Sequence, residues 1–344
     1  MKNLCIVILS VLCGGCAASH VIPDDNYTFH DTSRDNAAFR VAFDQDGNPY
    51  PSDPRQRPVR KEKKPCFKYC GFRLKNNQYN NFEYGAKADE MILDQYANAI
   101  NEALSDKKKL VLFIHGYNNS YEQIDEMMAQ FHRAISPDEE ETVIIEVVWD
   151  GLVSNGWFTH WFDSLTYSNL AGQFGVRRLL NRIDGTGKSL YFLTHSRGAG
   201  VAMSTLFDPV YDRHVRGPNC QTPANDIDYE AFSSDFKTVS LIMMAPAVGD
   251  GHFTTALGDQ VPDNTSMTLV LKNRDEATSK VIIAKLFGTT VAGYDSKQVK
   301  QLEKKGIVRV ERLGKDDSSW LDDHFYQSYL DRAVQRGIFR KFGL

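Results

Sequence analysis

The sequence lacks a strong excess of either charge, an apolar run of membrane-spanning length and any repeat. Its 344 residues carry a formal net charge of -4 at pH 7, so bulk charge attracts no polyanion and we expect no nucleic-acid partner. Apolar residues make up 42% of the chain and charged residues 24%, which excludes a disordered, collagenous or coiled-coil protein. The chain is long enough to bury a core without disulfide or metal staples.

The longest apolar stretch at the N-terminus, Leu4 to Leu12, is too short to cross a bilayer as a helix. It follows a basic start and precedes a Gly-Gly-Cys triplet that ends at Cys16, which is the layout of an export signal. The segment resembles a bacterial lipoprotein signal, in which cleavage before a cysteine leaves that residue, here Cys16, to carry the lipid. Cys13 stands where such signals usually have leucine. Ordinary cleavage near Ala17-Ala18 therefore remains an alternative. A buried N-terminal strand is a separate alternative to any export signal.

This resemblance implies a signal peptide over residues 1–15 and an exported extension over residues 16–84. It implies a lipid-anchored protein of the bacterial cell envelope, in the periplasm or on the outer surface, whereas ordinary cleavage implies a soluble secreted or periplasmic protein. From His20 to about Pro65 the extension is polar and proline-rich, which indicates a tether. Its basic run between Arg55 and Lys64 could rest on anionic headgroups, although charge runs are more often simply solvated.

Cysteine is scarce, with six residues in the chain. Cys66 and Cys70 have no neighbouring histidines, so their spacing is a poor match to a zinc site. In the oxidising environment that export implies, they could form a disulfide. Cys220 is expected to be a lone thiol in a loop.

From about residue 85 to the C-terminus, helical and strand patterns alternate. The continuous apolar run Leu110 to Ile114 predicts a strand buried on both faces, and residues 86–104 have a helical apolar period. Ser120 and Gln123 predict a capping box for the next helix. Further strands are predicted at residues 143–148, 190–193, 239–244, 267–271 and 307–310. The predicted fold class is therefore α/β, a doubly wound, mostly parallel sheet with loop insertions, and ligands at the carboxyl ends of the strands.

The strongest local signal surrounds Ser196. An apolar strand from Leu190 runs into this serine, and Gly198 and other small residues open a helix behind it. This is the strand-turn-helix of a nucleophile elbow, which exposes the serine hydroxyl at the edge of the sheet and aims the helix N-terminus at developing negative charge. Thr194 stands where the first glycine of Gly-x-Ser-x-Gly usually lies, and its β-branched side chain could distort the turn.

A second turn, His115-Gly116-Tyr117-Asn118-Asn119, follows an earlier core strand. With it, residues 85–344 resemble the α/β-hydrolase family, specifically bacterial members of esterase and lipase type. The resemblance implies a serine hydrolase whose oxyanion hole is formed by the backbone N–H groups of Tyr117 and Arg197. The Arg197 side chain could also steer an anionic substrate, or it could point away from the site.

The family order of serine, acid and histidine selects the remaining catalytic groups. Among the histidines after Ser196, His324 follows the last predicted strand and precedes a closing helix, as the family's base does, whereas His214 and His252 come too early. Asp275, after the predicted strand 267–271, resembles the family's acid, and Asp250 is the alternative acid one strand earlier.

The predicted function is hydrolysis of a small-molecule carboxylic ester through an acyl-enzyme, by the triad Ser196, His324 and Asp275. The same groups would serve an amidase or peptidase, and a non-enzymatic surface lipoprotein could retain the scaffold. His115 and His195 have no second ligand at metal spacing, so we predict no metal, and no cofactor. The sequence gives no prediction of oligomeric state. Aromatic residues after the strand 143–148 could form an apolar substrate pocket or close the core: Trp149, Trp157, Phe158, Trp161, Phe162 and Tyr167.

Overall fold

The computed structural model describes residues 18–21, 23, 38–45, 47–50, 65–68, 71–74, 82–135, 140–154, 161–207, 230–248, 253, 261–272, 297–314 and 325–344. The strands are β1 (Ala18–Ser19), β2 (Ala38–Phe43), β3 (Pro65–Lys68), β4 (Gly71–Leu74), β5 (Lys109–Ile114), β6 (Thr142–Trp149), β7 (Val153–Ser154), β8 (Ser189–His195), β9 (Thr238–Met244), β10 (Thr265–Leu271) and β11 (Arg309–Arg312). The helices are α2 (Phe82–Leu104), α3 (Tyr121–Ala134), α4 (Trp161–Leu170), the π-helix η2 (Ala171–Val176), α5 (Arg177–Leu180), α6 (Gly198–Leu206), α10 (Lys297–Lys304), α11 (Tyr326–Gln335) and the 3₁₀ helix η4 (Phe339–Phe342).

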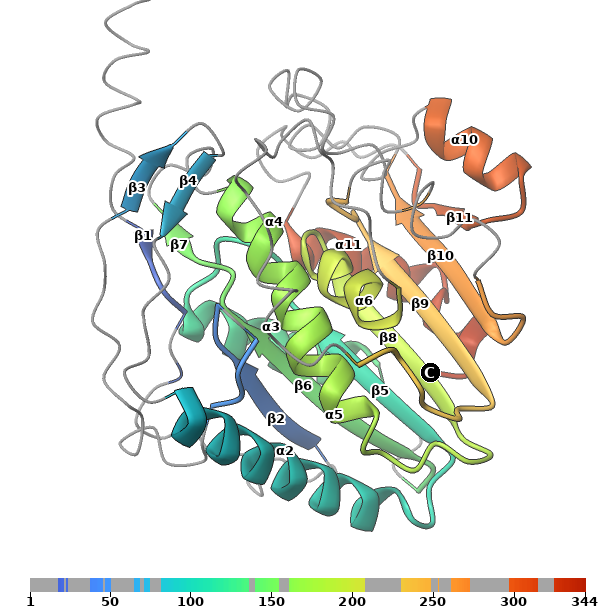
Figure 1. The fold of residues 1–344 in the computed structure, drawn as a ribbon. Helices are drawn as coiled ribbons and strands as arrows, with labels where there is room; N and C mark the ends of the chain where they lie inside the picture. Colours follow the sequence, from blue (N-terminus) through green and yellow to red (C-terminus); the bar gives the residue numbers. More distant parts are fainter. Residues whose placement is uncertain are drawn as a thin grey trace, which may run out of the picture.

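Seven parallel strands form the central sheet in the order β11-β10-β9-β8-β5-β6-β2 (Figure 1). The chain goes from β5 outward to β6, then crosses back to β8 and continues to β9, β10 and β11 in the opposite direction. The order therefore reverses between β5 and β8, and the crevice at the carboxyl ends of these two strands is where such sheets bind ligands. The predicted doubly wound parallel sheet is confirmed.

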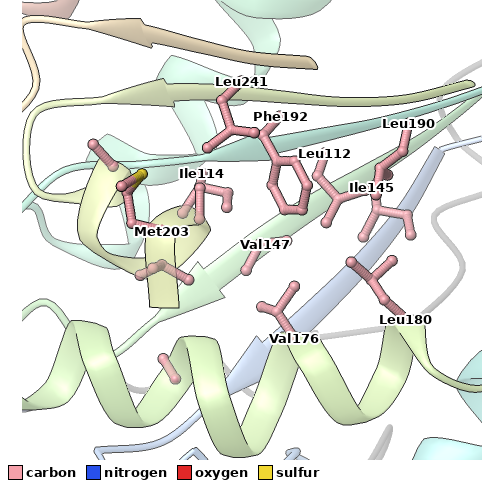
Figure 2. Packing of buried hydrophobic residues seen from close by; sticks show 14 of the residues in the cluster. Leu112, Ile114, Ile145, Val147, Val176, Leu180, Leu190, Phe192, Met203 and Leu241 are labelled. Carbon is pink, nitrogen blue, oxygen red and sulfur yellow. The ribbon is translucent and has the colours of Figure 1, made fainter. Parts of the chain in front are cut away.

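Helices cover both faces of the sheet because successive residues of each strand point to opposite faces. On β5, Leu112 and Ile114 pack into a core with α2, α5 and α6, while Val111 and Phe113 pack into a second core with α3 and α11. Figure 2 shows the first core, in which side chains from several strands meet the helices beside them. Full burial of each Leu or Ile is worth about 1.5–3 kcal/mol relative to exposure. A strand that is buried on both faces needs the continuous apolar runs that the sequence shows.

Most predicted elements are present, with small shifts at their ends. Helix α2 includes the predicted residues 86–104 and begins four residues earlier. The predicted capping box is formed, since the Ser120 hydroxyl accepts the Gln123 N–H and the Gln123 side chain accepts the Ser120 N–H. The strand predicted at residues 307–310 is present as β11, Arg309–Arg312, which begins two residues later and lies at the edge of the sheet. Within the described residues, no helix combines the length and apolarity needed to span a bilayer.

The extension expected as a tether, residues 16–84, contributes strands to the fold. Its residues Ala38–Phe43 form β2, which pairs in parallel with β6 at one edge of the central sheet. The polar interruption in this strand is Arg40, whose Nε donates to Glu146 of β6 at 2.7 Å. Both side chains are buried. A charged residue is tolerated within this strand because its partner is supplied by the neighbouring strand.

Candidate active site

Ser196 occupies a sharp turn between β8 and α6. Its φ of 52° lies in the left-handed region that non-glycine residues rarely adopt. The Ser196 N–H donates to the Met244 carbonyl at 2.9 Å, and the Ser196 carbonyl accepts the Ala247 N–H at 2.9 Å. The end of β9 and the segment that follows it thus hold the turn on both sides. Ser196 is 5% exposed, so it lies just beneath the surface at the carboxyl edge of the sheet.

Two glycines allow the turns after β5 and β8 to approach closely. A Cβ on Gly198 would lie 2.5 Å from the carbonyl oxygens of Ile114 and His115. A Cβ on Gly116 would lie 3.0 Å from the Cβ of Ser196. The first of these distances is shorter than any real contact allows. Gly198 therefore makes room for the tight turn, and the neighbour that requires it is the backbone at the end of β5.

His115 holds the turn that contains Tyr117. Its Nε2 accepts the Trp149 N–H at 3.1 Å, so the proton of the neutral ring is on Nδ1, which lies 2.8 Å from the Gly116 carbonyl oxygen. Burial lowers the pKa of His115 to about 4, which keeps the ring neutral. The Asn119 side-chain amide donates to the carbonyls of Gly116 and Tyr117 at 3.1 Å each. His115 therefore fixes this turn through both ring nitrogens.

Trp149 belongs to the core. Its indole N–H donates to the His115 carbonyl at 2.9 Å, and its ring stacks on His115 at 5.6 Å between centroids. It is 0% exposed. Tyr167 is buried as well, and the side chains of the other aromatic residues of this stretch lie outside the described part. For Trp149, closing the core is the correct interpretation.

The Arg197 side chain points into the protein. Its Nε donates to Ser168 Oγ at 3.0 Å and one terminal nitrogen donates to the Ala247 carbonyl at 2.7 Å. The residue is 0% exposed. The expectation that this guanidinium steers an anionic substrate is therefore wrong, because its donors are used to join α4, α6 and the segment after β9. The direction of the side chain does not bear on the predicted role of the Arg197 backbone N–H as an oxyanion donor.

The sharp turn forms with threonine at position 194. Thr194 is 0% exposed, and its hydroxyl has no hydrogen-bond partner among the residues that the structure describes. The next residue, His195, packs edge-on against Tyr326 of α11, with 5.5 Å between ring centroids. The N-terminal end of α11 thus lies against the strand that leads to Ser196.

Several predicted functional residues lie outside the described residues: His324, Asp275, Asp250, Cys16, Cys70 and Cys220, with the rejected His214 and His252. The described chain resumes at Phe325, directly after His324, and it ends at Lys272 and Val248 before the two acid candidates. Lys272 and Val248 follow β10 and β9 at the carboxyl edge. The side chain of Cys66, which belongs to β3, is also outside the described part.

A further buried acidic residue, Asp150, lies at this edge and is not among the residues predicted from the sequence. Asp150 directly follows β6, is 1% exposed, and lies 2.5 Å from Nδ1 of His20 through one carboxylate oxygen. Its other oxygen accepts the N–H groups of Val21 and Leu152. Asp250 and Asp275 are candidates because each lies in a loop after a predicted strand, and Asp150, which follows the predicted strand 143–148, meets the same condition. Its partner is 130 residues away in the sequence, which no local pattern reveals.

No group of three or more His, Cys, Asp or Glu side chains in the described part of the chain is arranged to hold a metal ion.

Comparison with known proteins identifies a family similarity. A family model described as "Alpha/beta hydrolase of unknown function (DUF900)" matches residues 94–333. A solved structure of an uncharacterized protein from Bacillus cereus ATCC 10987 aligns with 16% sequence identity and a TM-score of 0.36, over 76% of this chain and 70% of that chain. No curated protein matches the chain.

Proposed function

Because the chain belongs to the alpha/beta hydrolase family DUF900, we propose that it is an exported serine hydrolase that cleaves carboxylic esters. Ser196 is the nucleophile, His324 the general base and Asp275 the acid that orients it, with Asp250 as the alternative acid. The backbone N–H groups of Tyr117 and Arg197 bind the oxyanion.

The proposed reaction forms and hydrolyses an acyl-enzyme. Ser196 Oγ attacks the ester carbonyl carbon while His324 takes the hydroxyl proton, and the two N–H groups stabilise the tetrahedral oxyanion. Collapse of this intermediate breaks the C–O bond, and His324 returns the proton to the leaving alkoxide, which departs as the alcohol. Water then attacks the acyl carbon with His324 again as base, and the carboxylic acid leaves as Ser196 recovers its proton.

The observation that carries the proposal is the strained turn at Ser196. A φ of 52° is costly for serine, yet the turn is held by Met244 and Ala247 and fits against Gly116 at the switch point of the sheet. Backbone strain of this kind is found where a side chain must be aimed. The helix that follows directs the positive end of its dipole toward the same place.

The described neighbours of the other candidates support their roles. Tyr326, two residues after His324, packs against His195 beside the nucleophile. Lys272, three residues before Asp275, follows β10 at the carboxyl edge. The export signal and the lipid on Cys16 rest on the sequence of the N-terminus, and with them we propose a cell-envelope location.

A fluorophosphonate probe tests the nucleophile directly, since it reacts with an activated serine. We expect labelling of the full-length protein that is lost in Ser196→Ala, together with a loss of ester hydrolysis of roughly 10⁴-fold or more. Ser204→Ala is the matched control: it removes a buried hydroxyl of α6 that donates to Asn169 and should keep both labelling and activity. A folded wild-type protein that is not labelled would overturn the proposal in favour of a binding scaffold.

Two further measurements define the reaction. Hydrolysis of short p-nitrophenyl esters but not of peptide anilides supports the esterase, and the reverse supports an amidase. Asp275→Asn should reduce turnover strongly, whereas Asp250→Asn should not. If the two variants exchange these results, Asp250 is the acid.

A further inference from the structure

The described chain begins at Ala18, two residues after the predicted lipid-bearing Cys16, and this first segment is part of the fold. We call residues 18–21 the N-terminal strap. Within it, β1 pairs antiparallel with β7, so that Ala18 lies opposite Ser154 and Ser19 opposite Val153. Figure 1 shows β1 and β7 side by side, at the end of the molecule toward which the central strands run. That end is also the location of Ser196.

Asp150 binds the C-terminal end of the strap, at His20 and Val21. One carboxylate oxygen lies 2.5 Å from Nδ1 of His20 and the other accepts the Val21 N–H at 3.0 Å. Val21 is 2% exposed and Asp150 1%. A carboxylate at this depth is stabilised by its hydrogen-bond donors and by the adjacent imidazole. The strap is therefore bound at defined positions and does not behave as the start of a free tether.

Short contacts connect the strap to the candidate nucleophile. Gly151 follows Asp150, and a Cβ on it would lie 3.2 Å from the Gly116 carbonyl oxygen and 3.5 Å from Cα of Tyr117. Gly116 in turn touches Ser196, since its own Cβ would lie 3.0 Å from Cβ of the serine. The strap thus joins the fold beside the turn that carries one of the proposed oxyanion donors.

The direction of the strap leads away from the sheet. Val21 lies at Asp150, directly after β6, whereas Ser19 and Ala18 lie opposite Val153 and then Ser154, progressively further along β7. Toward its N-terminus the strap therefore runs outward from the carboxyl edge. Cys16 precedes Ala18 by two residues in the sequence, so a lipid on Cys16 would be attached close in the chain to the start of the strap.

We propose that the lipid anchor holds the carboxyl edge of the sheet against the membrane, and that the substrate is an amphipathic ester dissolved in that membrane. This inference rests on the proposed function, because it needs both lipid on Cys16 and catalysis by Ser196. An anchor on a long flexible chain would let the domain rotate freely. An anchor about two residues from a fixed strap presents one edge, and esters in the bilayer reach Ser196 at a high effective concentration.

Tether length provides the activity test. The full-length, membrane-extracted protein is reconstituted into vesicles of phosphatidylethanolamine and phosphatidylglycerol that contain a long-chain fluorogenic ester. A flexible Gly-Ser linker of about 20 residues, inserted between Ala17 and Ala18, adds a mean span of roughly 25 Å and leaves the strap unchanged. We expect hydrolysis of the bilayer ester to fall about tenfold or more, with hydrolysis of a short water-soluble ester unchanged. The same linker placed after Leu344 is the control and should change neither rate.

Lipid crosslinking tests the orientation independently of activity. With a photoactivatable phospholipid in the same vesicles, we expect crosslinks mapped by mass spectrometry at β7 and its surroundings. The opposite edge, for example Lys108 and Gly187, should remain unlabelled, and labelling should become even when the linker precedes Ala18. Equal labelling of both edges in the wild-type protein, or an unchanged rate on the bilayer ester with the linker, would overturn the inference.

Two controls separate this failure from failure of the proposed function. If the wild-type protein does not hydrolyse the short ester, the proposed function is refuted. If its measured mass shows no lipid on Cys16, the anchor is refuted. Either result also refutes the inference. If the lipidated protein hydrolyses the short ester but is crosslinked equally at both edges by the photoactivatable phospholipid, only the proposed orientation is refuted.

Discussion

Two hydrogen bonds, both donated by Trp149, join Trp149 to His115 at the carboxyl edge of the sheet. The Trp149 N–H donates to Nε2 of His115, and the Trp149 indole N–H donates to the His115 carbonyl. These two bonds join the ends of the neighbouring strands β5 and β6. Because the turn after His115 packs against Ser196 through Gly116, the same pair fixes the wall of the candidate site.

The first prediction concerns the pH dependence of stability. The pKa of His115 is lowered to about 4 by burial, from an ordinary 6.5, so the unfolded chain binds this proton more readily than the folded protein. The stabilisation from His115 is complete above about pH 6.5 and is lost as the pH falls through the folded pKa. By about pH 4 the loss approaches roughly 3 kcal/mol. Urea unfolding of the wild-type protein between pH 7 and pH 4 measures it.

The variant His115→Gln isolates this contribution. Glutamine keeps an acceptor for the Trp149 N–H but does not titrate, so the variant should be less stable at pH 7 and lose less stability on acidification. Equal pH dependence in the two proteins would show that other groups cause the acid response.

The second prediction concerns Gly198. In Gly198→Ala the new Cβ would lie 2.5 Å from the carbonyl oxygens of Ile114 and His115, and backbone at that position cannot move without displacing the turn at Ser196. We expect a loss of about 1–3 kcal/mol in the free energy of unfolding and a fall in ester hydrolysis of roughly 100-fold. Gly187→Ala is the comparison. Its φ of 73° makes alanine costly by about 1 kcal/mol, but its Cβ meets nothing within 4 Å, so activity should be retained.

A matched pair of threonines gives the third prediction. Thr194 and Thr205 are both 0% exposed. The Thr205 hydroxyl donates to the Val201 carbonyl at 2.9 Å, whereas that of Thr194 has no partner within the described structure. Thr194→Val should therefore stabilise the protein by about 1 kcal/mol, and Thr205→Val should destabilise it by a similar amount. Thermal unfolding of both variants tests this, and destabilisation by Thr194→Val would show that the hydroxyl is satisfied in solution.

The sequence was sufficient to predict strands β5, β6, β8, β9 and β10 and the sharp turn at Ser196 because their signals are local. Leu110 to Ile114 is a buried strand whose apolar run reflects contact on both faces. Ser196 could be found because a tight turn between an apolar strand and a helix of small residues needs Gly198 nearby. In both cases, residues close in the chain determine the structure.

The features that the sequence could not predict depend on distant partners. The polar sequence around β2 predicts a tether, and Arg40 is acceptable in a strand only because Glu146 lies opposite on β6. The bond between His20 and Asp150 joins residues 130 apart. The direction of the Arg197 side chain likewise depends on Ser168 and Ala247. Each requires the packed structure to be known first.

The last prediction concerns the buried charge group that ties β2 to the sheet. Glu146 is 2% exposed and pairs with both Arg40 and His132. Burial disfavours the charged guanidinium, but the Glu146 carboxylate, Tyr121 and Asp125 together outweigh this and raise the pKa of Arg40. Removing one partner leaves the other buried with less compensation. We expect Arg40→Met and Glu146→Leu each to cost roughly 3 kcal/mol.

The double variant should recover much of this loss, because two apolar side chains of similar length can fill the space without a desolvated charge. The expected coupling free energy from the double-mutant cycle is at least about 2 kcal/mol, measured by urea unfolding at pH 7. If the two single losses simply add, the pair is not coupled and β2 is held by its backbone hydrogen bonds and by Phe39, Val41 and Phe43 in the core. Recovery would instead show that the charges specify the register of an edge strand more than they stabilise it.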